Sequence, residues 1–276
     1  MIVQEIARQS IDYLEKKEVS SARRIVEEML CHVLSMTRMD LYMDFRRPLN
    51  HDEIHSCRTI LSRLSTGEPI QYIVGSVSFY GCDIEVIPDV LIPRPETELL
   101  VDKIVKELGR YDLKNKTLWD LCSGSGCIGI ALKKALPDLQ VTLSDISPKA
   151  LTQARRNAEK NHVQVNFLEG SLFEPFRGQV DYIVVNPPYV NEADYRNLSP
   201  SVKNFEPRLA LYGGPDGLRC YRILASNYKK FFNPSGKLWM ELGTRQGNDV
   251  KELFEGKGVV EKDWSGHDRF FSLEIH

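Results

Sequence analysis

The stretch Asp120-Leu121-Cys122-Ser123-Gly124-Ser125-Gly126-Cys127-Ile128-Gly129 decides the fold of this chain. It joins a short apolar run to a helical pattern, and its glycines have the spacing G-x-G-x-x-G. Because glycine has no Cβ, Gly124 and Gly126 can adopt backbone angles closed to other residues and let a ligand approach the main chain, while Gly129 allows close helix–strand packing. The stretch predicts a strand, a loop and a helix that bind a nucleoside-containing ligand.

An acidic residue follows the next predicted strand. Asp145 lies about 20 residues beyond Gly124, where a carboxylate can accept both hydroxyl protons of a ribose. These residues alone leave open which nucleoside compound binds. A dinucleotide would place a pyrophosphate at the helix N-terminus, whereas S-adenosylmethionine carries a cationic methionine end. Asp120, directly before the loop, suits that cation better than a diphosphate.

Strand and helix patterns alternate beyond residue 115, which predicts a mostly parallel sheet with helices on both faces. The expected strands are Thr117–Leu121, Val141–Asp145, Val163–Leu168, Tyr182–Val185 and Lys237–Leu242. The expected helices are Ile128–Ala135, Ala150–Asn161 and Tyr221–Phe232. Close to the end, Val259–Asp263 and Phe270–Ile275 can pair antiparallel, so we predict an α/β, Rossmann-like sheet whose last strand is reversed.

Residues 1–75 carry helical periodicity and no strand pattern. Apolar residues recur every three or four positions in the clearest segment. A further helix follows Asn50, which together with Glu53 forms a capping-box pattern, and Gly67 ends it. This segment predicts a small helical bundle that forms a separate domain, 1–75.

Alternation with period two replaces the helical pattern from Gln71 onward. Residues 77–79 and 82–86 read as two strands, and Tyr80-Gly81 permits the turn between them. Pro95 suits the first turn of the helix that follows. We therefore expect a β-hairpin that links the helical bundle to the sheet. The hairpin and the sheet together form the second predicted domain, 76–276.

Composition and charge exclude several classes of protein. The 276 residues include 36 Lys and Arg against 38 Asp and Glu, a net charge of −2. Because neither half is basic, direct DNA binding is not expected. The six cysteines form no C-x-x-C pair and have no histidine at metal-ligand spacing, so no metal is expected. Neither a signal peptide nor a membrane-spanning run is present, which predicts a cytoplasmic protein without a membrane partner.

The fourth predicted strand runs into Asn186-Pro187-Pro188-Tyr189. The carboxyl ends of strands in an open α/β sheet are where ligands bind. The two prolines remove backbone N–H donors, and Pro187 holds Asn186 extended, so the motif offers mainly acceptors. It suits a planar nitrogen, either a carboxamide NH₂ or the exocyclic amine of adenine, which donates to the Asn186 side-chain oxygen and the Pro187 carbonyl while Tyr189 packs on the flat face.

A planar nitrogen is a poor nucleophile because its lone pair is delocalised. Holding it in line with an electrophilic methyl group can contribute about 7–11 kcal/mol through orientation. A general base would add roughly 3–5 kcal/mol, and the sequence shows none. The motif therefore predicts catalysis by positioning, with Asn186, Pro187, Pro188 and Tyr189 as catalytic residues.

With these motifs the chain resembles a class I S-adenosylmethionine-dependent methyltransferase, and most closely the release-factor glutamine methyltransferases of the PrmC/HemK type. The resemblance spans almost the whole length. Besides the glycine loop and Asn186–Tyr189, it rests on the segments 67–73 (GEPIQYI), 91–98 (LIPRPETE), 206–211 (EPRLAL) and 213–218 (GGPDGL).

The resemblance implies methylation of the glutamine side-chain amide in the Gly-Gly-Gln motif of peptide chain release factors, a step in translation termination. Domain 1–75 would then dock the release factor. Arg94 and Glu96 would shape the mouth of the substrate pocket beside the Asn186–Tyr189 motif. The residues that would bind the cofactor S-adenosylmethionine are Asp120, Cys122, Ser123, Gly124, Ser125, Gly126, Asp145, Leu172 and Asn186. Among these, Leu172 would flank the adenine.

Other functions share parts of this pattern. Glutamine methylation of a ribosomal protein and amine methylation of adenine in nucleic acid use the same chemistry, but the second would need base flipping and phosphate contacts. A nicotinamide-dependent oxidoreductase fits the glycine loop and leaves the Asn186–Tyr189 motif unexplained. A noncatalytic scaffold for the translation machinery is a further alternative.

Overall fold

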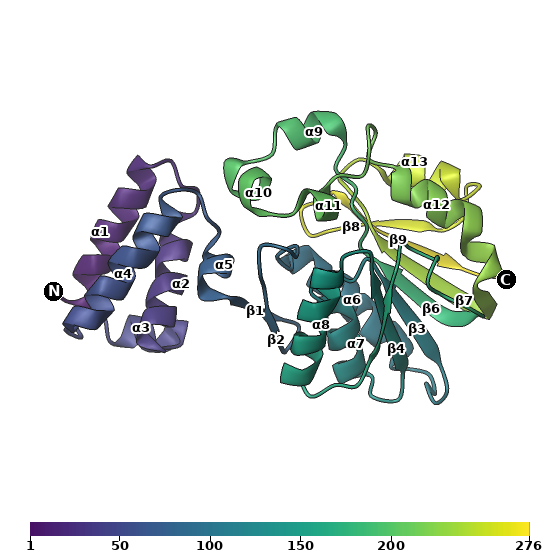
Figure 1. Ribbon diagram of the computed structural model, residues 1–276, viewed down its shortest axis with the longest axis horizontal. Coiled ribbons are helices and arrows are strands. Elements are labelled where there is room, and N and C mark those ends of the chain that lie inside the picture. The colour runs from purple at the N-terminus through teal and green to yellow at the C-terminus, as the bar shows by residue number, and fades with distance from the viewer. Residues whose placement is uncertain (276) are drawn as a thin grey trace. The chain divides into compact units, whose positions relative to one another are not determined.

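The computed structural model describes residues 1–275. It contains two compact units, and the chain passes between them more than once. The first unit consists of Met1–Gly75 and Ser199–Phe205, and the second consists of Ser76–Leu198 and the chain from Glu206 onward. Figure 1 shows that the first unit is helical and that the second carries the sheet.

The first unit is built from short amphipathic helices. Leu14, Met29 and Leu30 are among the fully buried side chains of its core. The predicted capping box is present, because the Glu53 amide donates to Asn50 Oδ1 (2.8 Å) and the Asn50 amide donates to the Glu53 carboxylate (2.9 Å). The helices are α1 (Val3–Lys16), α2 (Ala22–Leu34), α3 (Arg38–Met43), α4 (His51–Leu64), α5 (Ile70–Val74) and α10 (Pro200–Phe205).

The expectation of an extended chain from Gln71 is wrong, because residues 70–74 form the helix α5. Pro69 precedes the first turn with φ −60°, and Gly75 ends the helix with φ +86°. A short apolar run does not distinguish helix from strand by its periodicity, and here the flanking proline and glycine favour the helix.

The predicted hairpin begins after Gly75. Its strands, β1 (Ser76–Phe79) and β2 (Cys82–Glu85), pair antiparallel. Tyr80 and Gly81 have φ values of +43° and +73°, which the tight turn requires at both central positions. The helix α6 (Pro95–Leu108) then begins at Pro95 as expected.

The second unit contains a seven-stranded sheet of order β5-β4-β3-β6-β7-β9-β8. Only β9 runs against the others, because it is antiparallel to both of its neighbours. This confirms the predicted mostly parallel sheet with its last strand reversed, and it inserts that strand between β7 and β8. The strands are β3 (Thr117–Leu121), β4 (Gln140–Asp145), β5 (Asn166–Glu169), β6 (Val180–Val185), β7 (Phe232–Glu241), β8 (Val259–Lys262) and β9 (Asp268–Glu274).

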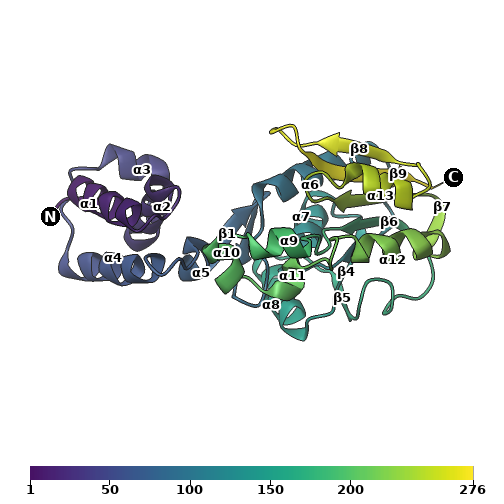
Figure 2. The same ribbon diagram turned by 90° about the horizontal axis from the view of Figure 1, so that it is seen from above.

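Helices cover both faces of this sheet (Figure 2). One group consists of α6, α7 (Cys127–Ala135) and α8 (Pro148–Lys160). The other consists of α12 (Arg219–Asn227) and α13 (Gly247–Leu253), and its buried side chains share a core with strand residues such as Ile183 and Leu238. The short helices α9 (Glu192–Arg196) and α11 (Arg208–Leu211) lie in the connection between β6 and α12.

Two predicted boundaries are wrong. The expected helix Tyr221–Phe232 ends at Asn227, a 3₁₀ turn spans Tyr228–Lys230, and Phe232 already begins β7. Strand β5 begins at Asn166 because the Val163 amide still donates to the Ala158 carbonyl at the end of α8. In both places the apolar pattern continues across the junction of two elements, so periodicity alone could not divide it.

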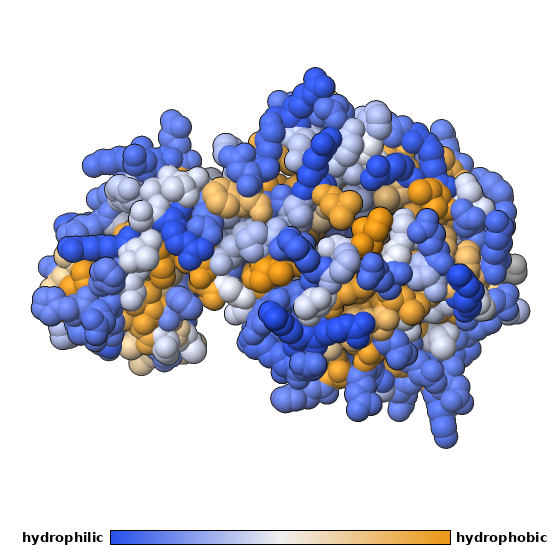
Figure 3. All heavy atoms as spheres, in the orientation of Figure 1, coloured by the Kyte–Doolittle hydropathy of each residue, from blue (hydrophilic) through white to orange (hydrophobic). Residues whose placement is uncertain are grey.

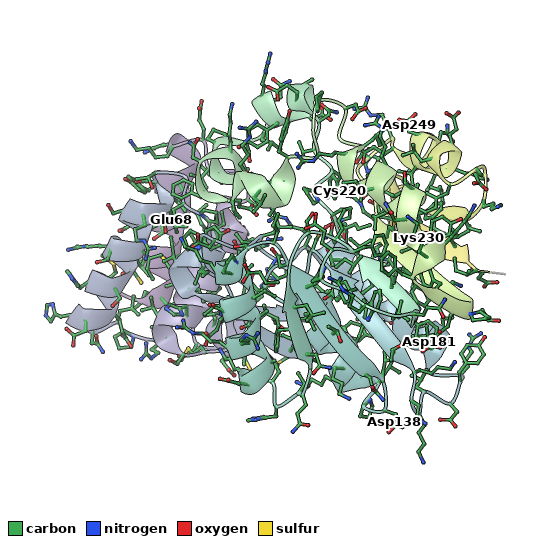
Figure 4. The ribbon with its side chains drawn as sticks, turned by 45° about the vertical axis from the view of Figure 1, so that its right-hand side comes forward. Glu68, Asp138, Asp181, Cys220, Lys230 and Asp249 are labelled. Carbon is green, nitrogen blue, oxygen red and sulfur yellow. The ribbon has the colours of Figure 1, made fainter. Side chains whose placement is uncertain are left out.

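The carboxyl ends of β3, β4 and β6 meet at one edge of the sheet, since these strands are parallel neighbours. Figure 4 shows Asp138, in the turn before β4, and Asp181, near the amino end of β6, on the opposite side from Cys220. The loops that carry the predicted site therefore converge on one side. Within residues 1–275, no helix is long and apolar enough to cross a membrane.

Candidate active site

The glycines of the loop after β3 have different roles. Gly124 has φ +54° and open space where a Cβ would lie, so a ligand can approach its backbone. Gly126 has φ +81°, and a Cβ there would lie 2.9 Å from Leu143 and 3.0 Å from Ala154. Gly126 therefore serves the packing of α7 and α8 against β4, a role that the sequence assigned to Gly129 alone.

Asp145 ties the end of β4 to the glycine loop. Its carboxylate accepts hydrogen bonds from the Gly124 amide (2.8 Å) and the Ser147 amide (2.9 Å). Burial raises the pKa of Asp145, and these amides oppose that effect. A carboxylate held in this way keeps lone pairs free for ribose hydroxyls, because each carboxylate oxygen can accept more than one hydrogen bond.

Asp120 is fully buried beneath the same loop. Its Oδ2 accepts a hydrogen bond from the Gly129 amide (2.8 Å), whereas its Oδ1 has no partner among residues 1–275. Burial raises the pKa of Asp120 to about 8. The buried hydroxyls of Ser123 and Ser144 are likewise without partners within the described chain. Unsatisfied buried acceptors are costly, so this cluster fits a ligand that brings a cation and hydrogen-bond donors, such as the methionine end of S-adenosylmethionine.

Two further predicted cofactor residues, Cys122 and Ser125, lie in this loop, and Leu172 follows β5. Cys122 has φ +57° and packs against the hydrophobic core of the sheet, and burial raises the pKa of its thiol well above the usual value. Leu172 is 5% exposed and also has a positive φ of +46°. Ser125 is held from behind, because its carbonyl accepts a hydrogen bond from Asn157 Nδ2 (2.8 Å).

Asn157 on α8 is a residue that sequence analysis missed. Its side chain also pairs with the backbone of Glu85, accepting from the amide (2.8 Å) and donating to the carbonyl (3.0 Å). One buried amide thus connects the glycine loop to the hairpin. An asparagine on the buried face of a helix is the only signal in the sequence, and it does not identify partners 32 and 72 residues away.

The Asn186–Tyr189 motif leaves the sheet beside the glycine loop. Leu121 pairs with Val185 in the β3–β6 register, so Cys122 and Asn186 follow directly at adjacent strand ends. Gln246 Nε2 donates to the Tyr189 carbonyl (3.0 Å), and the Tyr189 hydroxyl donates to Glu241 Oε1 (3.3 Å). The structure therefore brings the two predicted motifs together, and hydrogen bonds to Gln246 and Glu241 hold the second motif in place.

Glu241, at the end of β7, is a second residue that the sequence did not reveal. It is 1% exposed and accepts hydrogen bonds from Tyr189 and from the Thr97 hydroxyl (2.6 Å). Burial raises its pKa, and the Thr97 hydrogen bond and the charge of Arg269 oppose this effect. A carboxylate at the carboxyl end of a buried apolar strand is the signal that could have identified it.

Two glycines of the 213–218 segment allow the motif to sit close to the backbone behind it. A Cβ on Gly213 would lie 2.6 Å from the Pro188 carbonyl oxygen, and one on Gly217 would overlap the Tyr189 carbonyl oxygen. Gly217 also has φ +78°. Larger residues at either position would displace the Asn186–Tyr189 motif, which explains why glycine is needed at both positions of this segment.

Arg94 and Glu96 stand at the start of α6. The Arg94 guanidinium forms an ion pair with Glu206 (2.5 Å), whose side chain is 1% exposed. Glu206 also accepts from the Ile92 amide (3.4 Å). Arg94 therefore neutralises a buried carboxylate, and Glu96 is partly exposed. Among residues 1–275, no group of three or more His, Cys, Asp or Glu side chains could hold a metal ion.

The family comparisons agree with this geometry. Residues 95–200 match the methyltransferase small domain, and residues 5–75 match the PrmC N-terminal domain. The chain also resembles the fold of a Pyrococcus furiosus methyltransferase, with a TM-score of 0.52, 19% identity, and coverage of 71% of this chain and 90% of that one. The fold and the site define a methyltransferase of class I.

Two curated relatives give the particular family. The release factor glutamine methyltransferase of Geobacter sulfurreducens is 41% identical over 93% of this chain and 91% of its own length. That of Chlamydia trachomatis is 38% identical over 99% of this chain and 94% of its own length. The chain belongs to the release factor glutamine methyltransferase family.

Proposed function

We propose that this enzyme transfers a methyl group from S-adenosylmethionine to the side-chain amide nitrogen of the glutamine in the Gly-Gly-Gln motif of peptide chain release factors. The observation that carries the proposal is the placement of Asn186 directly beside Cys122 at adjacent strand ends, within a family match over nearly the whole chain. That family favours a release factor over a ribosomal protein, an adenine amine or a nicotinamide reaction. Such a substrate implies a cytoplasmic enzyme.

The residues of the Asn186–Tyr189 motif would hold the substrate amide. Asn186 Oδ1 and the Pro187 carbonyl accept its two hydrogens, and the rigid Pro187-Pro188 backbone keeps these acceptors in place. The nitrogen gains a methyl group and loses one proton to solvent. Orientation supplies most of the rate enhancement, because positioning alone can contribute about 7–11 kcal/mol.

The cofactor would lie against the glycine loop. When bound, S-adenosylmethionine supplies a methyl group attached to a positively charged sulfur. Asp145 would hold the ribose, Leu172 would flank the adenine, and the unpartnered Asp120 Oδ1 would balance the cationic end. The open space beside Gly124 leaves room for that contact.

The first unit would dock the release factor. Its helix α3 exposes Met39 and Met43, which are 73% and 81% exposed and lie one turn apart on the same side. Figure 3 shows hydrophobic side chains over this part of the first unit. Tyr42, on the same helix, donates a hydrogen bond from its hydroxyl to Glu27 (2.5 Å). Neighbouring exposed apolar side chains, methionines above all, suit a protein partner.

Mass spectrometry tests the proposal. A recombinant release factor is incubated with the enzyme and a labelled methyl donor, and the Gly-Gly-Gln peptide is sequenced. One labelled methyl group on the glutamine amide is the expected result. A release factor with glutamate in place of that glutamine is the control. Label on another residue, or only on ribosomal protein or RNA added in parallel, would contradict the proposal.

A further inference from the structure

Asn186 contacts Thr97, which is not one of the predicted site residues. Its Nδ2 lies 3.5 Å from Thr97 Oγ1, and Thr97 Oγ1 lies 2.6 Å from Glu241 Oε2. Thr97 is 2% exposed and Glu241 is 1% exposed, so both are shielded from water. The three side chains come from α6, the end of β6 and the end of β7.

The number of available hydrogens decides the direction of both hydrogen bonds. A threonine hydroxyl has one hydrogen. The charge of Arg269 and the Thr97 and Tyr189 hydrogen bonds favour the ionised form of Glu241, and an ionised carboxylate can only accept. At 2.6 Å that hydrogen is donated to Glu241. The Thr97 oxygen can then only accept, so the Asn186 atom that faces it must be the NH₂ group. The other end of the same planar amide, Asn186 Oδ1, therefore points away from Thr97.

We propose that Thr97 and Glu241 are positioning residues that set the orientation of the Asn186 amide, so that its oxygen rather than its nitrogen faces the substrate. This inference rests on the proposed function. A glutamine side-chain NH₂ needs an acceptor, and a reversed Asn186 would oppose it with a second NH₂ donor. The carboxylate of Glu241 thus determines the polarity of an acceptor that it does not touch.

Glu241 is itself held in place from other directions. The Tyr189 hydroxyl donates to its Oε1 (3.3 Å), and the Tyr221 hydroxyl donates to its backbone carbonyl (2.9 Å). Tyr189 belongs to the same motif as Asn186. A single buried carboxylate therefore holds both ends of the motif: Asn186 through Thr97, and Tyr189 through a direct hydrogen bond.

Steady-state kinetics with a release factor test this role. In Thr97→Val the hydroxyl is replaced by a methyl group of similar size, and we expect kcat to fall on the order of 10-fold to 10²-fold, with KM for the release factor and the Kd of S-adenosylmethionine almost unchanged. Thr97→Ser keeps the hydroxyl and should restore kcat. Glu241→Leu removes both carboxylate oxygens, so the Thr97 hydroxyl loses its acceptor and can turn its hydrogen toward Asn186. This variant should therefore lower kcat as Thr97→Val does.

A matched control lies at the amino ends of the strands, opposite the carboxyl ends that carry the site. Thr117 Oγ1 donates to the Asp181 carboxylate (2.9 Å) and accepts from the Asp181 amide (3.2 Å), which repeats the pattern away from the site. Thr117→Val should lower the melting temperature and leave kcat unchanged. If Thr117→Val loses as much stability as Thr97→Val and kcat falls equally in both variants, the loss of kcat is a general effect of destabilisation. That result would overturn the positioning role.

Nuclear magnetic resonance gives a readout that does not require turnover. In the wild-type enzyme the Asn186 side-chain amide should show contacts to the Thr97 methyl group and slow hydrogen exchange, and Thr97→Val should speed that exchange. Unchanged exchange and unchanged kcat in Thr97→Val would refute the inference while wild-type methylation of the release factor upholds the proposed function. Wild-type enzyme that leaves the release factor unmethylated would refute the proposed function instead.

Discussion

The Gly124 amide donates a hydrogen bond to Asp145 across 2.8 Å, which joins the loop after β3 to the end of β4. The two residues therefore do not act independently. A change at Asp145 removes the expected ribose ligand and also releases the loop that carries the expected contact with the rest of the cofactor.

Asp145→Ala should weaken S-adenosylmethionine binding by about 10-fold to 10²-fold, since a hydrogen bond to a charged group contributes roughly 1.5–3 kcal/mol. It should also lower the melting temperature, because the Gly124 and Ser147 amides lose their acceptor. Isothermal titration calorimetry measures the affinity. Asp138→Ala, in the exposed turn before β4, is the control, and equal affinities for the two variants would count against the ribose contact.

Asn186→Ala should retain cofactor binding and lose methyl transfer by several orders of magnitude, because the substrate amide then lacks its side-chain acceptor. Calorimetry with the cofactor and a methylation assay separate the two effects. Turnover close to that of the wild type would remove Asn186 from the mechanism.

Asp120 should make cofactor binding depend on pH. Its pKa is about 8 in the folded chain, and a cationic ligand stabilises the ionised form. Affinity for S-adenosylmethionine should therefore increase as the pH rises through about 8 and should be accompanied by proton release. Calorimetry in buffers of different ionisation enthalpy detects that proton. Asp120→Asn should bind more weakly and show no such pH dependence.

The same group has a predictable effect on stability without cofactor. Below about pH 4 Asp120 is protonated in folded and unfolded chains alike. Between there and about pH 8 only the folded chain keeps the proton, so the contribution of Asp120 to the free energy of unfolding falls as the pH rises through this window. Chemical denaturation at several pH values should show a smaller decline for Asp120→Asn, and an identical decline would show that Asp120 is ionised throughout.

Gly213→Ala should lower kcat and cost about 1–3 kcal/mol of stability, because its Cβ would press on the Pro188 carbonyl oxygen. Gly256→Ala is a comparison in open space, where the positive φ of +75° strains the backbone but nothing lies within 4 Å of the added carbon. It should lose stability without losing kcat. Denaturation and methylation assays on both variants distinguish a displaced motif from general destabilisation.

Replacement of Met39 and Met43 by serine should raise KM for the release factor several-fold and leave cofactor affinity and stability unchanged, since both side chains are exposed on α3. Ile223→Ser, another exposed apolar position but on α12, is the control. If KM rises equally in both, the effect is not specific to the first unit and the docking role is wrong.

Local patterns predicted those parts of the site that are contiguous in the chain. The glycine loop, the hairpin turn at Tyr80-Gly81 and the Asn186–Tyr189 motif each depend on backbone preferences of a few neighbouring residues, which the sequence states directly. Boundaries failed where the same apolar pattern suited two elements, as in the short helix α5 and at the junction of α12 with β7.

The sequence by itself determined the alternating fold, the glycine loop and the rigid Asn186–Tyr189 segment, because these follow from local periodicity and from glycine and proline geometry. Only the tertiary structure decided which distant side chains support them. Thr97 and Glu241 are 144 residues apart and meet because α6 packs against β7. The packing of helices on strands that creates such pairs is a property of the folded chain. Once the two side chains meet, the single hydrogen of the Thr97 hydroxyl fixes the direction of the hydrogen bond.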